Sequence, residues 1–157
     1  MNKNLKKVIS ATAALAISAS GVAAFAASYP DVADTASYKQ AVDELSALNI
    51  VNGYEDGTFQ PDKNVTRAEI TKMVVTALGD TVLNSAEAAK GRDTQFTDVP
   101  GTHWAAGYIS VGTSSQAGNF INGYSATEFG PEDNVTFAQA MKMLVGALGY
   151  TYYSEQN

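Results

Sequence analysis

The strongest constraint on this chain is an internal repeat, because the segment 51–79 returns as the segment 121–149. The first segment begins with Val-Asn-Gly-Tyr and the second with Ile-Asn-Gly-Tyr, and both end in Ala-Leu-Gly. Of the 29 aligned positions 15 are identical, which is too many for chance. The repeat extends upstream, since Tyr-Pro-Asp-Val at 29–32 is matched by Phe-Thr-Asp-Val at 96–99. Chains of this kind usually stack like units into a binding surface.

The first 26 residues differ in composition from the rest and have the pattern of an export signal. Three lysines come first, an uncharged run rich in alanine follows over 8–25, and Ala24-Phe25-Ala26 has the small residues of a cleavage site. A single transmembrane anchor is the alternative, but the run is short, poor in leucine and lacks a basic stop-transfer cluster. We therefore expect export and a mature chain that begins at Ala27.

The mature chain is strongly acidic, because cleavage removes three of the ten basic residues and none of the sixteen acidic ones. This balance disfavours nucleic acid and anionic membrane as direct partners. The chain has no cysteine, which excludes a disulfide framework and thiolate catalysis. Stability must come from apolar burial, and about 130 residues suffice for one core or for two small units that share one.

Each copy is predicted to form a helix, a glycine-rich loop and a second helix, so the expected fold class is all-α. The second helices are bounded most sharply, since Thr66 and Thr136 begin capping boxes and Gly79 and Gly149 follow at the left-handed C′ position. The residues expected to be buried are Ile70, Met73, Val74, Ala77 and Leu78 in the first copy, and Ala140, Met143, Leu144, Ala147 and Leu148 in the second.

The first helix of each copy is less sharply bounded. After an Asp34-Thr35 start signal, one apolar stripe is predicted, consisting of Tyr38, Ala41, Val42, Leu45 and Leu48. The corresponding stretch 104–111 is weakened by Gly107 and Gly112, which lower helix propensity. Between the copies, the polar segment 80–95 is predicted to be a linker with a short helix over 85–90.

The order Tyr-Pro-Asp-Val, helix, Asn-Gly-Tyr-Glu-Asp-Gly-Thr-Phe, Val-Thr-Arg-Ala-Glu resembles the S-layer homology (SLH) domain, and Phe-Thr-Asp-Val with His103 and Trp104 opens a second one. The resemblance implies a pseudo-symmetric helical assembly, in which three repeats usually associate and the grooves between them hold glycan. The expected divisions are a signal peptide at 1–26, repeat one at 27–79, a linker at 80–95, repeat two at 96–149 and a tail at 150–157.

The resemblance implies that the chain anchors an exported protein non-covalently to the wall of a bacterium, usually a Gram-positive one. The implied partner is secondary cell-wall polymer, a peptidoglycan-linked glycan that often carries an anionic pyruvylated sugar. No cofactor, no metal, no nucleic acid and, after signal cleavage, no membrane are expected as partners. The alternative is a structural surface-layer protein whose repeats act mainly in self-association, and either self-association or a third repeat would complete the assembly.

Five residues are predicted to bind glycan: Arg67, Gly53, Tyr54, Glu69 and Trp104. The guanidinium of Arg67 is a planar fork of donors that suits a carboxylate, and free N–H groups at the start of its helix also favour an anion. The alternative is an exposed first-turn residue paired with an acidic neighbour such as Glu69. The resemblance implies that Gly53 and Tyr54 line the groove, unless they only shape the turn. Trp104 either flanks the neighbouring groove or anchors a helix in the core.

Repeat two departs from this pattern where binding chemistry would lie. Phe137 stands in place of Arg67, and Gln139 stands in place of Glu69. The capping box survives because glutamine can also close it, but the cationic fork is lost. Repeat one is therefore expected to be the competent site, and repeat two is expected to be mainly structural.

No catalytic constellation assembles, so an enzyme is not expected. His103 is the only histidine, which rules out a three-histidine metal site, and a catalytic triad would rest on an irregular stretch. The pairs Glu55-Asp56 and Glu132-Asp133 are expected to be solvated loop residues. The Glu-Asp-Gly sequence at 55–57 lacks the full ligand series of an EF-hand loop.

Overall fold

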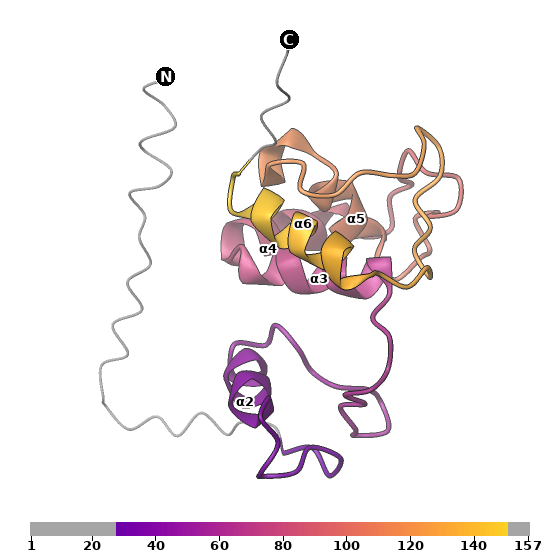
Figure 1. Ribbon diagram of the computed structural model, residues 1–157. Coiled ribbons are helices and arrows are strands. Elements are labelled where there is room, and N and C mark those ends of the chain that lie inside the picture. The colour runs from indigo at the N-terminus through magenta and orange to yellow at the C-terminus, as the bar shows by residue number, and fades with distance from the viewer. Residues whose placement is uncertain (1–27, 151–157) are drawn as a thin grey trace.

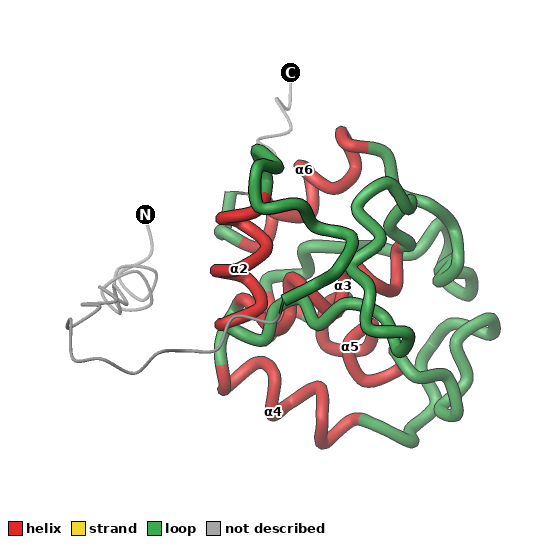
Figure 2. Tube along the Cα trace, turned by 90° about the horizontal axis from the view of Figure 1, so that it is seen from below, coloured by secondary structure: helices red, strands yellow, loops and turns green. Residues whose placement is uncertain are grey.

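The computed structural model describes residues 28–150, and the predicted export signal and the residues 151–157 lie outside this range. The described part is all-α, as predicted, and has no β-strand (Figure 1). Loops make up much of it and connect short helices (Figure 2). The elements are α2 (Lys39–Ala47), α3 (Arg67–Ala77), α4 (Asp80–Ala89), α5 (Ala106–Gly112), the 3-10 helix η1 (Ser115–Ala117) and α6 (Phe137–Ala147).

Both predicted capping boxes are present. The hydroxyl of Thr66 accepts a hydrogen bond from the backbone N–H of Glu69 at 3.2 Å, and the carboxylate of Glu69 accepts one from the N–H of Thr66 at 2.8 Å. Thr136 and Gln139 form the same pair at 3.2 and 2.8 Å. The starts of α3 and α6 are therefore set by local side-chain chemistry, which the sequence shows directly.

The ends of α3 and α6 follow the prediction in part. Gly149 has a φ angle of +84°, as expected of a left-handed C′ glycine. Gly79 combines a φ of +94° with a ψ of 175°, which lies outside the left-handed helical region, because this residue is also the N-cap of α4.

The buried face of α3 was predicted only in part. Val74 is buried, but Ala77 is exposed, and four residues outside the predicted face are buried, namely Arg67, Ala68, Thr71 and Val75. The prediction considered only apolar residues. The face of α3 that repeat two covers also includes the polar residues Arg67 and Thr71, so it is rotated from the predicted one.

The predicted buried face of α6 is half correct. Met143 is buried and Ala147 is packed against the core, but Leu144 and Leu148 are exposed. The sequence predicts a face for burial without showing whether a neighbour covers it. In the described residues, part of this face has no neighbour.

The main core lies among α3, α4, α5 and α6, which form one group in Figure 1. Within α5 only Ser110 is exposed. A Cβ atom on Gly107 would collide with the carbonyl group of Ala86 in α4, and one on Gly112 would lie 3.1 Å from the side chain of Thr71 in α3. The glycines that weaken the helix in the sequence are therefore the residues that let its neighbours approach.

Helix α2 lies apart from this group (Figure 1) and belongs to a second, small cluster with Tyr29, Val32 and Phe59. It begins at Lys39 without a side-chain cap, so the start signal predicted at 34–35 is wrong. The predicted stripe is also wrong for four of its five residues, because only Val42 is buried. The cluster is small, and the hydroxyl groups of Tyr29 and Ser46 lie 3.2 Å apart within it.

The segment 80–95 contains more helix than predicted. Helix α4 begins at Asp80 and packs along α5, where Ala86 is fully buried and Glu87 accepts a hydrogen bond from the hydroxyl of Tyr108 at 2.9 Å. This segment is part of the main core as well as a connection. None of the helices in the described residues is long and apolar enough to cross a membrane.

Candidate binding groove

A groove lies between the loop of repeat one, the first turns of α3 and the start of repeat two. Its volume is about 340 Å³. Gly53, Tyr54, Glu69 and Trp104 all line it, so the structure brings together four of the five residues predicted to bind glycan. These residues are up to 51 positions apart in the chain, and the packing of repeat two against α3 brings them together.

Trp104 is exposed over 48% of its surface, so the interpretation as a core anchor is wrong. Ala105, Ala106 and Ile109 take the core positions of this stretch, because small residues let α5 pack closely. The indole ring stacks on His103, with 5.8 Å between ring centres and 27° between the planes. An exposed indole held in this way offers a flat apolar surface to a ligand in the groove.

Tyr54 is held by two contacts at the edge of the groove. Its hydroxyl donates to Glu69 Oε1 at 3.2 Å, and Lys63 Nζ lies 3.8 Å from the centre of its ring. Gly53 next to it has a φ of +66°, and a Cβ atom there would lie 2.6 Å from the carbonyl oxygen of Thr58. Both readings of Gly53 therefore apply, because it shapes the turn and also lines the groove.

Two lysines that the sequence analysis did not single out, Lys63 and Lys72, also line this groove. Lys72 stands three residues after Glu69 on α3, which places both on one side of the helix. The sequence feature that could have drawn attention to Lys72 is that the equivalent position of repeat two, Lys142, is also a lysine. The lysines supply the positive charge in the groove that was expected from Arg67.

A second hollow adjoins the groove and shares Tyr54, Glu69 and Trp104 with it. Its lining adds the carboxylates of Asp56 and Glu132. An anion would be repelled from this end and attracted to the end that carries the lysines. No three His, Cys, Asp or Glu side chains in the residues 28–150 are grouped so that they could hold a metal ion.

Arg67 lies outside the groove and is only 6% exposed. Its Nε donates to the carbonyl oxygen of Phe129 at 2.9 Å, and a terminal nitrogen donates to that of Asn122 at 2.8 Å. The guanidinium carbon lies 4.3 Å from the ring centre of Tyr124 and 4.6 Å from that of Phe129. Burial lowers the pKa of Arg67, although an arginine stays charged at any physiological pH. The side chain fastens the loop of repeat two to α3.

The N–H groups at the start of α3 are not free for an anion either. The N–H of Arg67 donates to the carbonyl oxygen of Asp133, and the N–H of Ala68 donates to that of Pro131, both at 2.9 Å. Val135 donates to the carbonyl oxygen of Val65 beside them. The expectation of an open helix terminus is corrected here, because the loop of repeat two covers it.

Two aspartates hold the loops in shape, and the sequence analysis assigned them no role. The carboxylate of Asp31 accepts from the N–H groups of Phe59, at 2.9 Å, and Gln60, at 2.6 Å. Asp98 holds the loop of repeat two in the same way, accepting from Phe129 at 2.9 Å and Gly130 at 2.7 Å. The hydrogen bond from Phe59 is the main reason that the pKa of Asp31 is lowered. The sequence feature that could have identified them is the aspartate at the same position of Tyr-Pro-Asp-Val and Phe-Thr-Asp-Val.

The described residues define an all-α protein of two tandem repeats with a groove where the repeats meet. The family model for the S-layer homology domain matches the residues 28–71 and 95–141. The chain therefore belongs to the S-layer homology family, as its motifs predicted.

Relatives of this chain are proteins of the bacterial surface. A cell surface protein of Thermoanaerobacter kivui is 40% identical over 151 residues, which is 94% of this chain and 19% of the relative. A surface layer protein of Brevibacillus choshinensis is 36% identical, over 95% of this chain and 13% of the relative. A cellulosome-anchoring protein of Acetivibrio thermocellus is 31% identical, over 74% of this chain and 25% of the relative. The chain thus spans a quarter or less of these relatives. No solved structure matches it.

Proposed function

We propose that this chain anchors an exported protein to the bacterial cell wall by binding a wall glycan in the groove beside Trp104. The observation that carries the proposal is the convergence of Gly53, Tyr54, Glu69 and Trp104 on one open groove. Family membership supports it, and so do the relatives named for the cell surface, the surface layer and cellulosome anchoring. The proposed role is non-enzymatic, and the proposed location is the wall or surface layer of a Gram-positive cell.

Trp104 is the principal stacking surface in this proposal. A sugar ring has an apolar face that packs well on an aromatic plane, and the indole is about half exposed. Tyr54 is less available, because its ring is covered by Lys63 and its hydroxyl is bonded to Glu69. The carboxylate of Glu69 also accepts from the N–H of Thr66, so we assign it to holding Tyr54 in place.

The charge of the glycan follows from the two lysines. Lys63 and Lys72 lie in the groove and can pair with a carboxylate such as that of a pyruvylated sugar. Arg67 acts at one remove, as a positioning residue. By fixing the loop of repeat two against α3, it holds the start of repeat two, and with it Trp104, opposite the loop of repeat one.

The test is a pull-down of the chain from Ala27 onward on purified wall sacculi, with and without removal of the secondary polymer. We expect binding that needs the polymer, and we expect Trp104→Ala to weaken it by about tenfold with an unchanged thermal midpoint. Tyr38→Ala is the matched control, because Tyr38 is also an exposed aromatic residue but does not line the groove. Equal binding to sacculi stripped of polymer would overturn the proposal.

A further inference from the structure

The chain contains two Asn-Gly pairs, Asn52-Gly53 and Asn122-Gly123, at equivalent positions of the two repeats. Asparagine followed by glycine is prone to deamidation, because glycine has no side chain to hinder attack of its backbone nitrogen on the asparagine amide. Both pairs follow a β-branched residue and precede a tyrosine, so their reactivity in an unfolded chain should be nearly equal. A difference between them in the folded chain comes from the structure.

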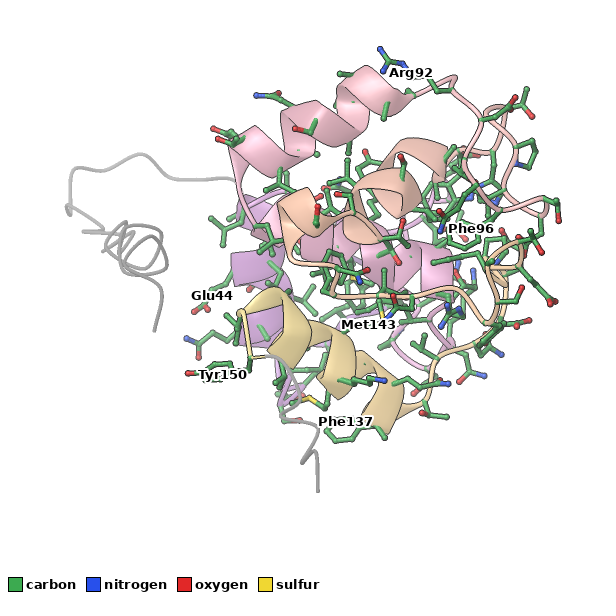
Figure 3. The ribbon with its side chains drawn as sticks, turned by 90° about the horizontal axis from the view of Figure 1, so that it is seen from above. Glu44, Arg92, Phe96, Phe137, Met143 and Tyr150 are labelled. Atoms are coloured by element: carbon green, nitrogen blue, oxygen red, sulfur yellow. The ribbon has the colours of Figure 1, made fainter. Side chains whose placement is uncertain are left out.

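The two loops share their nearest contacts. The N–H of the tyrosine that follows each pair donates a 2.8 Å hydrogen bond across its loop. A Cβ atom on Gly53 would meet the ring of Tyr29, and one on Gly123 would meet the ring of Phe96, which Figure 3 labels among the side chains of repeat two. Both asparagines are exposed. Exposure and these contacts therefore do not separate the two sites.

Hydrogen bonds from other parts of the fold hold Asn122. The guanidinium of Arg67 donates to its backbone carbonyl oxygen at 2.8 Å. The amide nitrogen of Asn119 lies 3.1 Å from its Oδ1, in the orientation that gives Asn119 its hydrogen bonds. For deamidation the side chain must turn toward the nitrogen of Gly123 and the backbone must rotate. Both hydrogen bonds resist this change.

Asn52 lacks these restraints. Within the residues 28–150, neither its backbone nor its side chain makes a hydrogen bond. It lines the groove that also contains Lys63 and Lys72, and it does not line the adjoining acidic hollow. The unrestrained asparagine is therefore the one that lies in the cationic part of the groove.

The pair Asp56-Gly57 could form the same ring, but this reaction needs an un-ionised carboxyl group. The carboxylate of Asp56 accepts from the hydroxyl of Thr58 at 2.6 Å, from its N–H at 3.0 Å and from the side chain of Gln60 at 3.1 Å. The bond from the Thr58 hydroxyl is the main reason that the pKa of Asp56 is lowered. Asp56 should therefore stay unchanged and serves as a second internal reference.

We propose that Asn52 is a site of spontaneous deamidation, which weakens the groove for an anionic glycan as the protein ages. The backbone nitrogen of Gly53 loses its proton and attacks Cγ of Asn52. The N–Cγ bond forms, the Cγ–Nδ2 bond breaks, and ammonia leaves. Water then opens the resulting succinimide ring at either carbonyl group and gives aspartate or isoaspartate.

Either product places a carboxylate in the groove of Lys63 and Lys72, where it opposes their charge and repels an anionic ligand. Isoaspartate also lengthens the backbone by a methylene group next to Gly53 and Tyr54. This consequence for binding rests on the proposed function, whereas the reaction at Asn52 does not.

Peptide mapping tests the reaction. The chain from Ala27 onward is incubated in mildly alkaline buffer, which favours the attacking nitrogen, and its peptides are assayed for aspartate and isoaspartate. We expect Asn52 to convert about tenfold or more faster than Asn122, because Asn122 must first lose a hydrogen bond to a charged group. In urea the two should convert at equal rates. Equal rates in the folded chain, or an unreactive Asn52, overturn the inference.

Binding to wall sacculi tests the consequence. The aged chain should bind several-fold more weakly than the fresh chain, and Asn52→Asp should show the loss without ageing. Asn52→Gln should bind equally before and after ageing, because its longer side chain closes a ring far more slowly. If the fresh chain does not bind, the proposed function fails and the peptide map still decides the reaction. An aged chain that has lost Asn52 but binds like the fresh one overturns the effect on the groove.

Discussion

Nε of Arg67 donates a 2.9 Å hydrogen bond to the backbone carbonyl of Phe129, 62 residues further along the chain. This bond joins the first turn of α3 to the loop of repeat two. It converts a residue with the sequence signature of a ligand-binding arginine into part of the contact between repeats. The contact between the repeats also places Trp104 of repeat two opposite the loop of repeat one, and the groove lies between them.

Arg67→Ala should therefore lower the stability of the fold by about 3 kcal/mol, because the buried carbonyl group of Phe129 and the partly buried one of Asn122 lose a charged donor. The sequence analysis assigned Arg67 to glycan binding, and that assignment predicts weaker wall binding instead. Urea denaturation followed by circular dichroism measures the change. Arg67→Lys keeps the charge without the fork and should recover only part of the loss. If Arg67→Ala has the stability of the wild type but no longer binds the wall, Arg67 contacts the glycan directly.

Lys72→Gln should weaken binding to sacculi without a change in thermal midpoint, because Lys72 lines the groove on an exposed side of α3. An ion pair at a surface groove is screened by salt, so we expect a loss of a few-fold at low ionic strength that shrinks in 0.5 M salt. Lys142→Gln is the control at the same position of repeat two. An effect of equal size from both variants would point to net charge and not to the groove.

Thr66→Ala and Thr136→Ala should each cost about 1 kcal/mol, because each removes an N-cap acceptor. Serine at either position keeps the hydroxyl and should largely preserve the thermal midpoint. Scanning calorimetry decides between these outcomes. If alanine is neutral at both positions, the capping boxes contribute nothing to stability.

The stability of the fold should fall in acid, partly through Asp31. Backbone N–H groups of Phe59 and Gln60 lower its pKa below the usual 3.8, so the folded state favours the ionised form. A lowered pKa contributes stability above the unfolded value, and this contribution is lost as the pH falls through the folded one. Urea midpoints should be level from pH 7 to about pH 5 and decline below about pH 4. Asp31→Asn should flatten the decline, and a slope equal to that of wild type would exclude this contribution.

The secreted protein should begin at or within a few residues of Ala27. This prediction rests on the first 26 residues, in which a positively charged region, an apolar region and a small-residue cleavage site follow one another. Mass spectrometry of the protein from the cell envelope identifies the N-terminus. Retention of Met1 would show that the segment is not cleaved.

The parts of the fold that rest on neighbours in the chain could be read from the sequence. Thr66 and Glu69 are three residues apart, and their two hydrogen bonds need no other part of the molecule. The same holds for the positive φ of Gly79. The repeat itself and the SLH motifs identified the family. Four of the five residues that the sequence predicts to bind glycan line one groove in the structure.

Contacts between the repeats decided the rest. Arg67 and Phe137 occupy the same place in two nearly equivalent helices, and one is buried whereas the other is exposed. Their local sequences cannot show this difference, because burial depends on which surface lies opposite. The sequence indicates only that Gly112 lowers helix propensity. The structure shows that its missing side chain leaves room for Thr71 of α3. The sequence by itself determined the repeats, their caps and the family, since these depend on residues close together in the chain. Only the tertiary structure decided which helix faces are covered. Coverage depends on contacts between residues far apart in the chain: repeat two covers the start of α3, whereas no described residue covers the equivalent face of α6.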